Sequence, residues 1–130
     1  MQPTKQLTIP AQDRPGTLAR IAKLLGKSHI NIVAMNCGCA TFASQGTIQI
    51  VVDDVGRAKN VLDEEHLSYT EQDVLYLELE NSPGCLGEFA GKLAAHGINV
   101  STGYGTAPKD CERASVVLRV SDLEAACKIR

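Results

Sequence analysis

The hydrophobic and polar residues of this chain form one pattern that occurs twice. From Lys5 to Gln12, and more strongly from Val74 to Asn81, apolar residues alternate with polar ones, which is typical of a half-buried strand. From Thr17 to Ser28, and again from Cys85 to His96, apolar residues return at helical spacing, which predicts an amphipathic helix. Each copy therefore begins with a strand that leads into a helix.

Further elements complete the first copy. We expect a second strand to begin at Ile30–Val33 and further strands at Thr47–Val52 and Leu67–Glu71. A helix from Val55 to Leu62 should follow the capping pair Asp53-Asp54. The order β-α-β-β-α-β predicts an α+β fold of the ferredoxin-like type, with a four-stranded antiparallel sheet and both helices on one face.

A shift of 68 positions lays one copy on the other without a gap. Leu7 falls on Leu75, Pro15-Gly16 on Pro83-Gly84, and Ile30-Asn31 on Ile98-Asn99. A repeat of this kind defines the unit of architecture, so the expected modules are residues 1–72 and 73–130. Each module is short for a core of its own, and we expect the two to bury surface against each other or against a second chain.

The second module lacks its last strand, because the sequence stops at Arg130 inside the second expected helix. Either the polypeptide is a fragment or that strand position is filled from elsewhere. An unpaired edge on the strand from Val74 would invite association. We expect Leu67–Glu80 to tie the two sheets together, as a hairpin or as one long bent strand, or a second chain to cover the edge. A homodimer is the favoured version.

Composition excludes several classes of protein. The 13 basic and 15 acidic residues give a net charge of −2, and no basic run or tryptophan is present, which argues against a nucleic-acid partner. Apolar runs are far shorter than a membrane span, and the N-terminus has no apolar signal region. The odd count of five cysteines suits reduced thiols, so we expect a cytoplasmic protein.

Two turns carry the candidate chemistry. Asp13-Arg-Pro-Gly16 and Asn81-Ser-Pro-Gly84 each join a strand to a helix N-terminus, whose free amides suit a carboxylate. A single such turn is more often a plain capped turn. Both copies, however, also place an asparagine, Asn31 or Asn99, fifteen positions after that glycine. Its amide either holds a zwitterionic ligand or bonds its own backbone at the turn.

These motifs resemble the ACT domain, a small regulatory module that binds amino acids, often in pairs. The resemblance is carried by the stretches DRPGTLARIAKLLGKSHINI and NSPGCLGEFAGKLAAHGINV. A tandem pair without an enzyme domain is similar to the small bacterial proteins that consist of two ACT modules. The resemblance implies an effector held between the first turn of one module and the start of the second strand of its neighbour. Carried onto this chain, it implies one site at Asn81, Gly84, Cys85 and Leu86 with Asn31, and a second at Asp13, Gly16, Thr17 and Leu18 with Asn99.

The two implied sites differ in charge. Asp13 holds a carboxylate where the second copy has Asn81, and a carboxylate repels the carboxylate of an amino acid. The Asn81 site is therefore the better candidate for a free amino acid.

We expect no enzyme activity, cofactor or metal. Cys37-Gly38-Cys39 has a C-x-C spacing, and the second copy does not repeat it. The preferred function is an amino-acid sensor that controls amino-acid metabolism. One alternative is a docking subunit of a separate metabolic enzyme with a vestigial ligand site. A third is an acylphosphatase-like hydrolase, which Arg14 disfavours because only the first copy has it.

Overall fold

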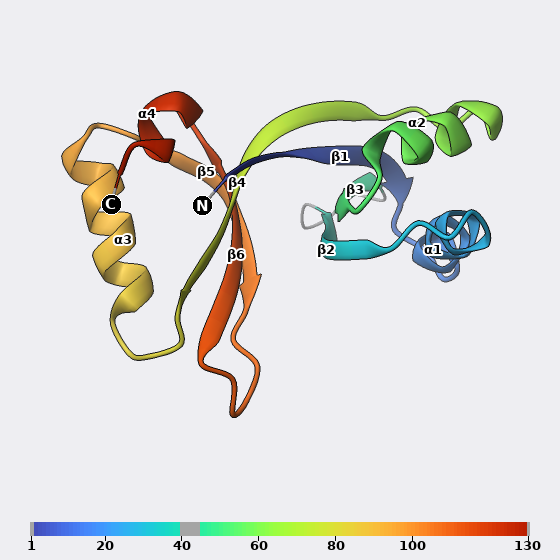
Figure 1. Cartoon of the computed structure of the whole chain (residues 1–130). Helices are drawn as coiled ribbons and strands as arrows, with labels where there is room; N and C mark the ends of the chain where they lie inside the picture. Colours follow the sequence, from blue (N-terminus) through green and yellow to red (C-terminus); the bar gives the residue numbers. More distant parts are fainter. Residues whose placement is uncertain (1, 40–44, 130) are drawn as a thin grey trace. The chain divides into compact units, whose positions relative to one another are not determined.

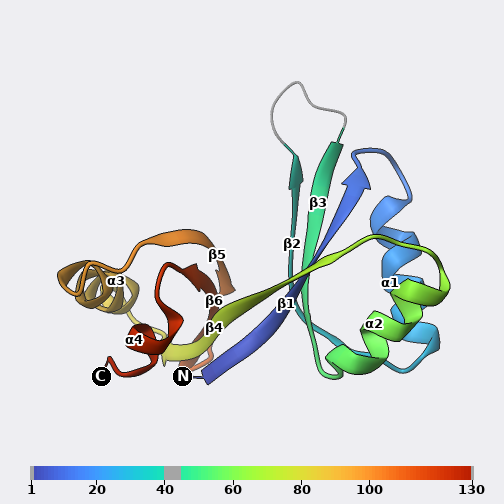
Figure 2. The same cartoon turned by 90° about the horizontal axis from the view of Figure 1, so that it is seen from above.

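A computed structural model describes residues 2–39 and 45–129 of the chain (Figures 1 and 2). It divides into two compact units. The N-terminal unit is Lys5–Gln72, and the C-terminal unit is Met1–Thr4 together with Asp73–Arg130. No helix within the described ranges is long and apolar enough to cross a membrane.

The N-terminal unit places two helices on one face of its sheet (Figure 2). Strand β3 runs antiparallel to both of its neighbours, β1 and β2. The elements are β1 (Gln2–Gln12), α1 (Thr17–Lys27), β2 (Ile32–Cys39), β3 (Gln45–Val52), α2 (Val55–Glu64) and the start of β4 (Thr70–Glu80).

Several boundaries differ from the expected ones, and two of them bear on how the strands pack. Strand β2 starts at Ile32 and continues to Cys39, well beyond the segment Ile30–Val33 that was expected to begin it. It is an outer strand whose Val33 and Met35 stay 47% and 40% exposed, so it needs no alternation of polar and apolar residues. Strand β4 begins at Thr70, and Leu67 and Tyr69 pack against the core before the strand starts.

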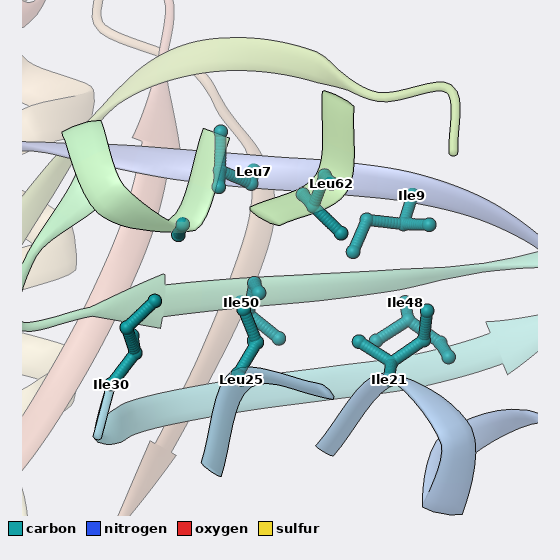
Figure 3. Close-up of a cluster of buried hydrophobic side chains, with 9 residues drawn as sticks. Leu7, Ile9, Ile21, Leu25, Ile30, Ile48, Ile50 and Leu62 are labelled. Carbon is teal, nitrogen blue, oxygen red and sulfur yellow. The ribbon is translucent and has the colours of Figure 1, made fainter. Parts of the chain in front are cut away.

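The core of this unit lies between the helices and the sheet. Figure 3 shows Leu7 and Ile9 of β1 facing Leu62 of α2, with Ile21 and Leu25 of α1 beneath β3. These side chains come from the alternating and helically spaced apolar residues that the sequence pattern predicts to be buried. The full cluster of buried residues is Leu7, Ile9, Ile21, Leu25, Ile30, Ile48, Ile50, Ala58 and Leu62.

The C-terminal unit repeats the arrangement. Strand β6 is antiparallel to β4 on one side and to β5 on the other, and α3 and α4 cover one face. Its own elements are α3 (Cys85–Ala95), β5 (Val100–Thr106), β6 (Arg113–Val120) and α4 (Leu123–Cys127), in addition to β4. The buried cluster is Leu75, Leu77, Phe89, Leu93, Ile98, Leu118, Ala126 and Ile129. The α+β fold with two ferredoxin-like modules in tandem is thus confirmed.

Strands β1 and β4 each contribute to both units. The strand order is β2-β3-β1-β4-β6-β5, so β1 and β4 are hydrogen-bonded neighbours. Residues Thr70 to Gln72 of β4 count with the N-terminal unit, where Gln72 Oε1 accepts hydrogen bonds from Gln6 Nε2 at 3.1 Å and Thr8 Oγ1 at 2.5 Å. The first residues of β1 count with the C-terminal unit.

The first residues of β1 therefore take the place beside β4 that the missing last strand of the second module would have occupied. The expectation of one long strand between the modules is confirmed, because β4 runs without a break from Thr70 to Glu80. The alternative in which a second chain covers the edge of β4 is not needed to pair that strand, because β1 lies beside β4.

Candidate functional site

Both turns end in a glycine with left-handed backbone. Gly16 has φ 94° and Gly84 has φ 92°, a conformation that side chains other than glycine rarely adopt. These glycines are the N-caps of α1 and α3, and neither helix has a side-chain capping hydrogen bond. Asp13 and Asn81 lie three residues before these glycines, and the side-chain amide of Asn81 bonds Pro108 O and Cys111 O.

The helix starts keep amides available. Cys85 N–H donates to Ser82 O at 3.3 Å, and Glu88 N–H donates to Gly84 O at 2.9 Å. Leu86 and Gly87 lie between these two residues, and the described hydrogen bonds include no acceptor for their backbone N–H groups. The same holds in α1, where Thr17 N–H donates weakly to Arg14 O at 3.5 Å. Unpaired amides at a helix N-terminus favour an anionic group.

Asn81 has a structural role in its own turn. Its Nδ2 donates to Pro108 O at 3.2 Å and to Cys111 O at 2.9 Å, and its backbone N–H donates to Glu112 O at 2.8 Å. These bonds hold the loop between β5 and β6 against the start of α3. Both amide hydrogens are used, so the carbonyl oxygen Oδ1 is the group that can accept a hydrogen bond from an ammonium.

Asn31 and Asn99 are held by their backbones. Asn31 N–H donates to Asp53 Oδ1 at 3.0 Å, and Asp53 N–H returns a bond to Asn31 O at 3.1 Å. Asn99 and Ser121 repeat this exchange, with both distances at 2.9 Å. The described hydrogen bonds do not include the side-chain amide of either asparagine, so the interpretation in which that amide bonds its own backbone gains no support.

Side chains at the two helix starts differ in chemistry. Thr17 Oγ1 donates to Gln12 O at 2.9 Å, whereas the equivalent Cys85 Sγ lies 3.0 Å from Ser82 Oγ. One residue further on, Leu18 is 39% exposed and Leu86 is 55% exposed. Large apolar side chains at both helix starts therefore stand in water.

A pocket opens beside the start of α3 and lies wholly in the C-terminal unit. Its volume is about 500 Å³. It brings Asn81 and Leu86 together with β5 and β6. The residues that line it are Leu79, Glu80, Asn81, Ser82, Leu86, Gly103, Tyr104, Gly105, Thr106, Ala107, Ala114, Val116 and Leu118.

The structure groups the expected site residues by unit. Asn81, Gly84, Cys85 and Leu86 lie together at the start of α3. Asp13, Gly16, Thr17 and Leu18 lie together at the start of α1. Within each unit the asparagine, Asn31 or Asn99, follows the opposite end of the helix. An 11-residue helix is about 16 Å long, so one small ligand cannot meet both groups inside one unit.

The pocket contains residues that the sequence did not single out. Gly103 and Gly105 of β5 form part of its wall, together with Ala107. The signal was present in the repeat, because the first copy has Met35 and Cys37 at the equivalent positions. Glycine inside a strand often marks a close approach of another group.

No cluster of three or more His, Cys, Asp or Glu within residues 2–39 and 45–129 could hold a metal ion. Cys37 is a free, exposed thiol. The side chain of Cys39, its partner in the C-x-C motif, lies outside what the structure describes.

Comparison with known families matches residues 2–127 to the family described as the ACT domain pair. A search of curated proteins gives no match. Among solved structures, a Bacteroides thetaiotaomicron protein is 27% identical, with a TM-score of 0.88 and coverage of 97% of this chain and 85% of that one.

Two further structures share the fold. The regulatory subunit of aspartate kinase from Thermus thermophilus, in its ligand-free form, is 18% identical with a TM-score of 0.72, and the match covers 94% of this chain and 86% of that one. The corresponding subunit from Thermus flavus is 16% identical with a TM-score of 0.68, at coverages of 91% and 83%.

Proposed function

The chain belongs to the family of ACT domain pairs, and on that premise we propose that it is a regulatory protein that binds a free α-amino acid. The proposed ligand carboxylate meets the amides of Leu86 and Gly87 at the start of α3. The ligand ammonium meets Asn81 Oδ1. The pocket beside them, about 500 Å³ in volume, is the observation that carries the proposal.

At the position before the Pro-Gly turn, charge favours the C-terminal unit. Asn81 brings none, whereas Asp13 at the equivalent position carries a carboxylate that repels the carboxylate of an amino acid. The Glu80 carboxylate, which also lines the pocket, is exposed and one residue further from the start of α3. The N-terminal turn, with Gly16, Thr17 and Leu18, is therefore the weaker candidate.

The family resemblance adds Asn31 as a second ligand contact of the Asn81 site, and Asn99 as that of the Asp13 site. The side-chain amide of Asn31 can both donate to a carboxylate and accept from an ammonium.

The proposed role is control of amino-acid metabolism in the cytoplasm, without catalysis by this chain. The similarity to aspartate kinase regulatory subunits supports a partner that is a separate metabolic enzyme. In this role the ligand changes the free-energy balance between two states of association. The alternative, a docking subunit with a vestigial site, would bind the same partner enzyme but would require no ligand.

Self-association is part of the proposal. The outer strands β2 and β5 carry exposed apolar side chains, and an outer strand can pair with a second copy of itself. We therefore propose a homodimer, and sedimentation equilibrium measures it directly. These exposed side chains are Val33, Met35 and Val100.

A thermal-shift screen of the twenty amino acids tests ligand binding. A ligand that binds only the folded state stabilises it by RT ln(1 + [L]/Kd), so the melting temperature rises as the ligand concentration exceeds Kd. A rise with one amino acid or a few related ones is the expected result. No shift with any of the twenty at millimolar concentration would leave the docking subunit as the better function.

Calorimetry on two matched variants then tests the site. Asn31→Ala should weaken binding about ten- to a hundredfold, because a hydrogen bond to a charged group is worth about 1.5–3 kcal/mol. Asn99→Ala, its repeat equivalent, should leave the affinity unchanged, and Asp13→Ala should have a small effect. Equal losses in the two asparagine variants would contradict the assignment to the Asn81 site.

A further inference from the structure

Two glycines of β5 lie on the face of the sheet that carries the helices. Gly103 pairs with Leu118 and Gly105 with Val116. Residues directly opposite each other in an antiparallel pair point to the same face. Leu118 belongs to the buried core of this unit, Val116 is partly buried against it, and both line the pocket. Any side chain at Gly103 or Gly105 would therefore be directed toward this same region.

Larger residues do not fit at these positions without displacement. A Cβ at Gly103 would lie 2.9 Å from Leu118 Cδ2, and a Cβ at Gly105 would lie 2.6 Å from Ser115 O. Gly103 is the position where a neighbour can yield, because only a leucine methyl group is in the way. At Gly105 the backbone of β6 itself would have to move.

The N-terminal unit has side chains at the same two places. Met35 pairs with Ile50 and Cys37 with Ile48, and both isoleucines are buried core residues. Met35 and Cys37 therefore stand on the helix-bearing face of their own sheet, where the C-terminal unit has only glycine. The two units consequently differ in the room that they leave beside the helix start.

The wall of the pocket is predominantly apolar. Leu86, at the start of α3, is 55% exposed and is the most exposed of the large apolar side chains in the described residues. An apolar group in the pocket would remove it from water, which is favourable. The apolar lining side chains are Leu79, Leu86, Ala107, Ala114, Val116 and Leu118.

We propose that this pocket, opened by Gly103 and Gly105, receives the side chain of the ligand and selects an apolar amino acid of the leucine, isoleucine, valine, methionine or phenylalanine class. The inference rests on the proposed amino-acid function and adds its specificity. Met35 and Cys37 occupy the equivalent space in the N-terminal unit, so each chain binds one such ligand.

Titration of the whole chain with leucine, methionine and phenylalanine, against lysine, aspartate and serine, tests the selection. An apolar ligand should bind at one molecule per chain. Gly103→Met, which places the residue of the first copy into the second, should weaken that binding at least tenfold. Cys37→Ala, at the position of the N-terminal unit that is equivalent to Gly105, should alter it less than twofold.

The outcomes separate the two levels of the proposal. If none of the six amino acids, nor any of the other fourteen, binds, the amino-acid function fails and the specificity fails with it. If lysine, aspartate or serine binds while the apolar ligands do not, the function stands and the apolar selection is overturned. An apolar ligand that binds Gly103→Met as tightly as the unchanged chain overturns the pocket assignment.

A milder variant keeps the test decisive if Gly103→Met does not fold, which its urea unfolding curve reveals. Gly103→Ala displaces only a methyl group of Leu118. It should weaken phenylalanine, the largest ligand, more than valine, the smallest. Equal effects on these two ligands, or none on either, would overturn the assignment.

Discussion

Gly84 shows how one residue can serve both the backbone and the site. Its φ of 92° needs glycine, while a Cβ at this position would meet no atom within 4 Å. Conformation alone therefore excludes other residues. The same turn leaves the amides of the first helical residues open to the solvent beside the pocket.

Gly84→Ala should lower the free energy of unfolding by about 1–2 kcal/mol, because alanine is strained in the left-handed region. The matched control is Gly91→Ala in the middle of α3, where the added methyl also meets nothing within 4 Å. That change should raise stability by about 0.5–1 kcal/mol through helix propensity. Urea unfolding measures both, and a loss of stability in both variants would mean that steric contact decides the outcome.

Tyr104 gives a pH-dependent prediction. Burial raises the pKa of its phenol from about 10 to about 12. The folded state then holds a proton that the unfolded state has released, so the contribution of Tyr104 to stability is complete below pH 10 and declines as the pH rises toward 12. Absorbance of tyrosinate against pH should show one step near 12 that disappears in Tyr104→Phe. A step near 10 that disappears instead would contradict the raised pKa.

At the scale of elements, β1 and β4 are the two strands that contribute residues to both units. Both have 11 residues and the same order of buried and exposed positions, so the repeat extends to their first three residues. In each strand those residues count with one unit and the remainder with the other. Lys59 of α2 adds an ion pair to the start of β4, with its Nζ 2.8 Å from Glu71 Oε2.

Replacement of Gln2-Pro3-Thr4 by Ser-Gly-Ser tests the role of the start of β1. Loss of the side chains and of backbone order should weaken the pairing with β4, so we expect the amides of residues 73–80 to exchange at least tenfold faster. The amides of β3 in the N-terminal unit should keep their rates. Unchanged exchange in β4 would mean that the first residues of β1 do not protect it.

At the scale of the whole molecule, the two units have separate cores but share two strands. Neither unit can unfold completely without disrupting β1 or β4. The chain should therefore unfold in a single transition although it contains two modules. Leu7 and Leu75, which are equivalent in the repeat and both fully buried, offer a matched test.

Leu7→Ala and Leu75→Ala should each destabilise the protein by about 2–5 kcal/mol, and each should move the same transition. Urea unfolding followed by far-UV circular dichroism measures this. Two resolved transitions, of which each variant moves only one, would show instead that the units fold independently.

The sequence by itself determined the repeat, the element order and the core. Alternation at Leu75 and Leu77 and helical spacing at Leu25 and Leu93 are local consequences of burying one face, so they are legible without coordinates. The turns were legible for the same reason, because Pro-Gly before an apolar helical stretch specifies a backbone conformation. The glycine caps were not, because Asp13 and Asn81 look like capping residues until the position of the helix start is known.

Only the tertiary structure decided the fate of the missing strand and the nature of the pocket. The neighbour of β4 is a segment far away along the chain, and hydrogen bonds between strands leave no periodic trace that identifies the partner. Gly103 and Gly105 lie in β5, but the pocket also needs α3, β4 and β6 at particular distances. Local pattern reports which face of an element is buried, whereas pairing and cavities depend on which elements meet.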